Sequence, residues 1–258
     1  MKKVITIILT VLIFLSAATL GVATVFRVSE VTVDASMVSP IAKKEAEAFR
    51  RRLLETYVKE STLFLDDTAV KEIVKEFPYF RLVAVEKAMP NRLVVKVAED
   101  AEVYAVANAD GSAYYQLNAD GDILGVRADY ANRLDGNPNL LIKGLTLAAQ
   151  EDNVLGGDDC YAPTLRVLQK ANGLLGGIRR NITQAELLRR SPETILCLTT
   201  REGVLLYLLN PQTMTEEKAQ KAIDKYLSLS DEQRLMGCVV AFEDESGIGC
   251  EYRKNIFE

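Results

Sequence analysis

The residues that could carry out chemistry are limited first by the absence of histidine from the chain. Histidine is the general base of most serine and cysteine nucleophile systems and the commonest zinc ligand. The chain has four cysteines, but none are spaced as CxxC, which argues against a zinc site. The cysteines are Cys160, Cys197, Cys238 and Cys250. Histidine-dependent hydrolases and transition-metal centres are therefore disfavoured.

The carboxylates leave two chemical alternatives. Asn118, Asp120 and Asp122 are spaced like the start of a calcium loop, but Ile123 replaces the glycine of the sixth position and the closing glutamate is missing. The segment is therefore predicted to be a turn. An exported hydrolase would need two buried carboxylates about 5–10 Å apart in a cleft. We expect no catalytic residue, no cofactor-binding residue and no metal ligand, and hence no enzyme.

The first element is an apolar run that follows Lys2 and Lys3. Val4 to Phe26 are 23 residues without a charge, and a helix of that length spans roughly 35 Å, enough for a bilayer core of about 30 Å. The sequence predicts a transmembrane helix at 4–26, a cytoplasmic tail at 1–3 and all later residues outside the cytoplasmic membrane. The alternative is a cleaved signal peptide, because Gly21 to Ala23 resemble a cleavage site.

The cysteines of an exported chain leave two further alternatives open. An even number of thiols permits two disulfides, and the other possibility is four free thiols. The formal net charge of -5 gives no support for a nucleic-acid-binding protein.

The next block, 27–100, is predicted to be a small α+β domain. Alternating apolar residues in "FRVSEVTVD" indicate a strand, and "TLFLDD" leads into a helix that Pro78 ends. Between them lies a helix that Ser39 and Pro40 start; its apolar face is Ala42, Ala46, Phe49, Leu53 and Tyr57. Two strands follow, joined by the turn Met89 to Asn91. The predicted order is β-α-α-β-β.

The last block, 101–258, is predicted to be strand-rich. Short apolar runs are separated by the turn signals Asp110-Gly111 and Asp120-Gly121. Helices are predicted at 163–175 and 216–229, and the stretch 129–159 is expected to be loop-rich. The chain is predicted to end in a β-hairpin of "CVVAFED" and "IGCEYRK".

Several of these segments together resemble the FtsQ/DivIB family of bacterial cell-division proteins. The similar segments are "LFLDDTAV", "FPYFRLVAVEKAMPNRLVVKVAED", "YYQLNADGDIL" and "VVAFEDESGIGCEYR". The resemblance implies a POTRA domain at 27–100 and an FtsQ-type β domain at 101–258. It also implies a non-enzymatic divisome scaffold that couples its partners to septal peptidoglycan synthesis, located at the division septum in the cytoplasmic membrane.

The resemblance implies partners of the FtsB/DivIC and FtsL types, with a septal peptidoglycan synthase as a further candidate. A partner strand would add to the terminal strand, at the residues Phe242, Ile248, Cys250, Tyr252, Arg253 and Lys254. Phe242 and Tyr252 would be anchors, and the alternative is that both are ordinary core or cross-strand residues. A POTRA-containing component of protein export or outer-layer assembly is the alternative function.

A basic helix face is a second candidate site. Arg50, Arg51 and Arg52 follow Lys43 and Lys44 on the helix after Pro40. Anionic lipid headgroups would attract such a face by about 1 kcal/mol per basic residue. The alternative is a solvated helix face that binds nothing.

Overall fold

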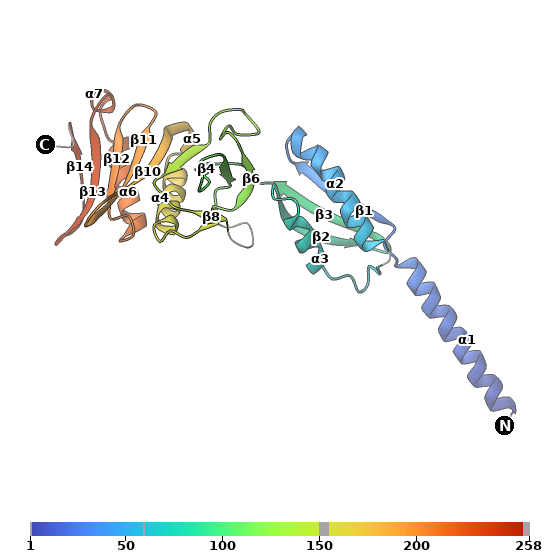
Figure 1. The fold of residues 1–258 in the computed structure, drawn as a ribbon. Helices are drawn as coiled ribbons and strands as arrows, with labels where there is room; N and C mark the ends of the chain where they lie inside the picture. The colour runs from blue at the N-terminus through green and yellow to red at the C-terminus, as the bar shows by residue number, and fades with distance from the viewer. Residues whose placement is uncertain (1, 59, 150–154, 255–258) are drawn as a thin grey trace. The chain divides into compact units, whose positions relative to one another are not determined.

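The computed structural model describes residues 2–58, 60–149 and 155–254. The chain divides into two compact units, Met1–Asp100 and Ala101–Glu258 (Figure 1). Both units combine helices with sheets, so the α+β class predicted from the sequence is present. Met1 of the predicted tail and 150–154 of the predicted loop-rich stretch lie outside the described residues.

The N-terminal helix α1 (Lys2–Val25) overturns one prediction. In the described part of the chain, no helix is both long and apolar enough to cross a membrane. The predicted transmembrane helix at 4–26 is therefore wrong. The single-pass localisation in the cytoplasmic membrane depended on it and is wrong as well.

The first unit has the predicted order β-α-α-β-β after α1. Its elements are β1 (Glu30–Met37), α2 (Pro40–Tyr57), α3 (Thr68–Lys75), β2 (Phe80–Ala88) and β3 (Arg92–Glu99). The strands form a sheet in the order β1-β3-β2, in which β1 and β3 are parallel and β2 and β3 antiparallel. The central strand is thus the last one in sequence.

Helix α2 forms as its sequence predicts. The Ser39 side chain accepts a hydrogen bond from the Ala42 amide at 3.2 Å, and Pro40 fills the first turn. The buried residues of α2 are the five predicted: Ala42, Ala46, Phe49, Leu53 and Tyr57. Glu99 at the end of β3 accepts bonds from the Ser39 amide and hydroxyl, at 2.7 and 3.1 Å. This carboxylate therefore ties the start of α2 to the sheet.

The second unit is built on a nine-stranded mixed sheet in the order β14-β13-β12-β11-β10-β7-β4-β5-β6. Its strands in this sheet are β4 (Tyr104–Ala107), β5 (Tyr114–Leu117), β6 (Ile123–Arg127), β7 (Leu140–Lys143), β10 (Ile182–Arg190), β11 (Glu193–Thr200), β12 (Leu205–Leu209), β13 (Cys238–Asp244) and β14 (Gly247–Arg253). A separate pair is β8 (Ala148–Ala149) with β9 (Leu155–Gly156). Part of the stretch predicted to be loop-rich is therefore strand β7, which lies inside the sheet between β10 and β4.

The helices of this unit are α4 (Tyr161–Leu174), α5 (Ile178–Asn181), α6 (Thr215–Leu227) and α7 (Asp231–Arg234). Helices α4 and α6 agree with the sequence to within two residues at each end, and they pack on each other. Helix α6 also packs on β12, β13 and β14. Alternate residues of these strands, such as Leu206, Leu208, Val239 and Ala241, are fully buried with the α6 residues Ala219, Ala222 and Ile223. Burial of this apolar surface on one sheet face holds the helices in place.

Candidate functional site

The candidate site is the outer edge of β14, the last strand of the nine-stranded sheet. On the side away from β13, no described strand pairs with β14. A strand in this position presents backbone N–H and C=O groups that another strand can bind. The site is therefore defined by which of these groups face outward and by what surrounds them.

The register with β13 decides which groups face outward. Asp244 lies opposite Gly247, and only Glu245 and Ser246 connect the two strands. Residues that flank a two-residue connection form a hydrogen-bonded pair, and hydrogen-bonded pairs alternate with non-hydrogen-bonded ones. The even-numbered residues Ile248, Cys250 and Tyr252 therefore direct their N–H and C=O groups outward.

The far end of the strand agrees with this alternation. A Cβ atom on Gly237, next to β13, would lie 2.7 Å from the Arg253 carbonyl oxygen. That carbonyl therefore faces β13, as expected for an odd-numbered residue of β14.

Side chains of the outward-facing residues lie on the sheet face that α6 covers. The Cys250 thiol lies 3.4 Å from the Lys221 carbonyl oxygen of α6. The Tyr252 hydroxyl donates to the Met236 carbonyl oxygen at 2.8 Å, and its ring packs against the core. Tyr252 is thus a half-buried residue of the hairpin, and burial raises the pKa of the Cys250 thiol to about 11.

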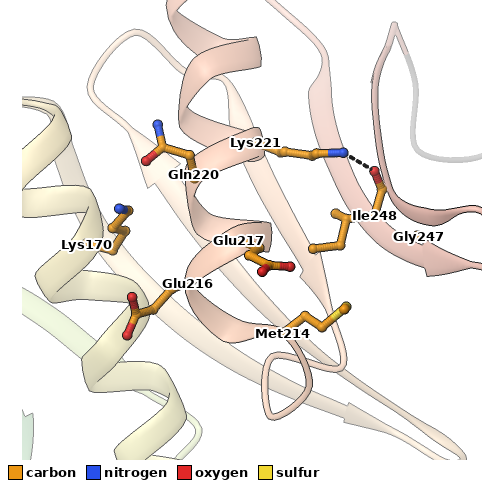
Figure 2. Close-up of a pocket in the computed structure, with 8 residues that line it drawn as sticks. All are labelled: Lys170, Met214, Glu216, Glu217, Gln220, Lys221, Gly247 and Ile248. Carbon is orange, nitrogen blue, oxygen red and sulfur yellow. Dashed lines mark hydrogen bonds between the residues drawn. The ribbon is translucent and has the colours of Figure 1, made fainter.

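Ile248 borders a hollow between α6 and the start of β14 (Figure 2). The hollow has a volume of about 410 Å³ and is lined on the helix side by Met214, Glu217 and Lys221. Lys170 of α4 also borders it. The Lys221 ammonium donates a hydrogen bond of 2.5 Å to the Ile248 carbonyl oxygen, drawn as a dashed line in Figure 2. One backbone group of the edge is therefore already occupied by a side chain.

The opposite face of the sheet carries a second concave surface of about 460 Å³. Tyr207, Val240 and Phe242 supply its apolar wall, and Arg190 and Arg253 border it. The Phe242 ring covers Gly249 on the neighbouring strand, where an added Cβ would meet the ring at 2.5 Å. Phe242 and Tyr252 therefore lie on opposite faces of the hairpin.

The predicted partner-binding residues thus share one hairpin but form no single cluster. Arg253 pairs with Glu251 on its own strand, and Lys254 is exposed directly after β14. Whether any of them touches a partner stays a prediction.

The predicted basic face of α2 lies in the other unit. Arg50 pairs with Glu47 at 3.2 Å, and Arg52 forms two hydrogen bonds to Glu76, at 2.9 and 3.0 Å. The Arg51 side chain donates to the Glu47 carbonyl oxygen. Arg50 and Arg52 are therefore engaged in ion pairs, and contact of Arg50, Arg51 and Arg52 with a membrane surface stays a prediction.

Two site residues could not be identified from the sequence pattern, Lys221 and Lys218. Lys218 is buried at the start of α6, where its ammonium donates to the carbonyl oxygens of Leu209 and Asn210 at 3.0 and 3.1 Å. Burial lowers the pKa of Lys218, and Glu243 at 3.5 Å opposes this effect. Lys218 thereby holds the connection that places Met214 beside the hollow.

Two carboxylates with buried side chains, Glu102 and Asp158, are engaged in structural hydrogen bonds and ion pairs. Glu102 is 1% exposed and accepts hydrogen bonds from Arg127, Asn139 and the Arg133 amide. Burial alone would raise the pKa of Asp158, but bonds from Arg189 and two backbone amides outweigh it and hold the pKa below its ordinary value. Asn118 accepts from the amides of Asp120 and Asp122 in a turn. All four cysteines are free thiols.

Comparison with known proteins identified no family, because no family model and no curated protein matches the chain.

Proposed function

We propose that this chain is a non-enzymatic scaffold of the bacterial divisome, of the FtsQ/DivIB type, that captures an extended segment of a partner on the outer edge of β14. The partner would be of the FtsB/DivIC type, associated with an FtsL-type protein, and the assembly would couple to septal peptidoglycan synthesis. The proposal rests on the similar sequence segments, and the single structural observation that supports it is the outer edge of β14, with which no strand of the described residues pairs.

The geometry of the edge favours strand addition over a side-chain-only contact. Three alternate residues, Ile248, Cys250 and Tyr252, direct six backbone groups outward in one line, of which the Ile248 carbonyl accepts a hydrogen bond from Lys221. Main-chain hydrogen bonds supply the affinity in complexes formed by strand addition. The hollow beside α6, which Ile248 borders, can receive a side chain of the added strand on that face of the sheet.

The test is co-purification of the full chain with a co-expressed FtsB/DivIC-type partner. Ile248→Pro removes an outward N–H without touching the bonds to β13, and proline is tolerated at edge positions of this kind. Ile248→Val keeps the N–H group and the apolar side chain and is the matched control. We expect the proline variant to lose the partner and the valine variant to retain it. A proline variant that stays folded and captures the partner undiminished would show that the edge is not the binding site.

A further inference from the structure

Lys221 occupies a position where an added strand would have to bind. Its ammonium lies 2.5 Å from the Ile248 carbonyl oxygen, and this carbonyl is one of the outward-facing groups of β14. Hydrogen bonds that involve a charged donor are roughly twice as strong as neutral ones. A backbone N–H of a partner can therefore reach this oxygen only by displacing a stronger donor.

The partner residue that displaces Lys221 is fixed by strand geometry. In an antiparallel pair, the residue directly opposite Ile248 exchanges both hydrogen bonds with it. Directly opposite residues also place their side chains on the same face of the sheet. For Ile248 that face carries the hollow beside α6 (Figure 2). One residue of the partner must therefore both replace Lys221 and put its side chain in the hollow.

The shape and lining of the hollow indicate which side chain fits. Its volume of about 410 Å³ can hold a large side chain, and Ile248, Met214 and the aliphatic part of Lys221 give it an apolar wall. Glu217 lies one helical turn before Lys221 and borders the same hollow. A displaced ammonium can pair with it, since Glu and Lys four residues apart on a helix attract each other.

We propose that the hollow between α6 and β14 is the subsite for a large apolar side chain of the added strand. We also propose that Lys221 is a specificity-determining residue, because it competes with the added strand for the Ile248 carbonyl oxygen. In the free chain Lys221 donates a hydrogen bond to the Ile248 carbonyl oxygen. This bond weakens the binding of strands that place no apolar side chain in the hollow. A strand with an apolar residue opposite Ile248 displaces Lys221 toward Glu217. This inference rests on the proposed strand addition at β14.

The test uses a strand probe and the full chain. The probe is a capped, fluorescently labelled peptide with the sequence of Gly247–Arg253 and serine in place of its cysteine. In one antiparallel register its tyrosine lies opposite Ile248. Lys221→Met keeps the length of the side chain and removes the ammonium. Lys170→Met removes a charge from the same hollow without touching the Ile248 carbonyl, and it is the matched control. Affinities follow from fluorescence anisotropy.

We expect the probe to bind Lys221→Met about tenfold more tightly than the wild-type chain, the factor that corresponds to the loss of one competing charged hydrogen bond. Lys170→Met should bind like the wild type, and a probe with serine in place of tyrosine should bind all chains weakly. Equal affinities of the probe for Lys221→Met and Lys170→Met, or no binding of the probe to Lys221→Met, would overturn the proposed competition by Lys221.

Failure of this inference can be distinguished from failure of the proposed function. If Ile248→Pro abolishes probe binding while Lys221→Met leaves it unchanged, strand addition at β14 is supported and the specificity role of Lys221 is refuted. If Ile248→Pro leaves probe binding and partner capture unchanged, both strand addition and the role of Lys221 are refuted.

Discussion

Substitution of Gly249 by alanine probes the packing of the terminal hairpin most sharply. A Cβ at this position would lie 2.5 Å from both Cε2 and Cζ of the Phe242 ring and 3.2 Å from Cδ2. The backbone of Gly249 does not belong to the glycines with positive φ, so alanine introduces a contact without backbone strain. The whole cost therefore arises from the displacement of one ring.

The magnitude follows from how far the ring must move. Carbon atoms pack at about 3.5–4.0 Å, so the ring must retreat by about 1 Å or more. Overpacking in a core costs typically about 1–3 kcal/mol. Phe242 is only partly buried and can rotate toward the open face, which favours the lower end, a loss of about 1 kcal/mol in the free energy of unfolding.

The same substitution should have the opposite sign once the ring is removed. In the Phe242→Ala background, alanine at 249 meets no ring, and its smaller loss of backbone entropy should stabilise the chain by about 0.4–1 kcal/mol. The assay is a double-mutant cycle in urea, followed by far-UV circular dichroism. If Gly249→Ala has the same sign and size in both backgrounds, the ring-over-glycine contact does not exist in solution.

Two further predictions concern buried carboxylates. Glu102→Ala leaves Arg127 and Asn139 without their shared acceptor. Urea denaturation should show a loss of about 3 kcal/mol in the free energy of unfolding, because a broken buried ion pair leaves an uncompensated charge. Glu102→Gln should lose less, and equal losses would contradict this reasoning. The pKa of Asp158 is lower in the folded chain than its ordinary value of about 3.9. The ionised carboxylate therefore stabilises the fold fully above pH about 3.9, and this contribution is lost as the pH falls through the folded-state pKa. Asp158→Asn should therefore be less stable than wild type at neutral pH, and the difference should shrink in acid; an unchanged difference at all pH values would refute the linkage.

The elements that the sequence predicts well are those with a local cause. Helix α2 follows from the cap at Ser39, the proline at position 40 and five apolar residues at helical spacing, all within one short segment. The terminal hairpin follows similarly from alternation around a short turn. Such signals need no knowledge of the rest of the chain.

The features that the sequence could not supply depend on contacts between distant segments. Strand β7 pairs in parallel with both β4 and β10, and nothing in Leu140–Lys143 specifies these neighbours. The transmembrane prediction for 4–26 rested on the apolar run alone, and among the described residues no helix is long and apolar enough to cross a membrane. The contact of Lys221 with Ile248 joins residues 27 positions apart, so spacing along α6 indicates only an exposed lysine.

The central claim, strand addition at β14, has a residue-level signature in amide hydrogen exchange. The full chain would be measured by NMR with and without the proposed FtsB/DivIC-type partner. We expect new protection at the amides of Ile248, Cys250 and Tyr252, which face outward, and little change at Gly249 and Glu251, which already bond to β13. Partner binding without protection at these three amides, or with equal protection along the whole of β14, would contradict the account.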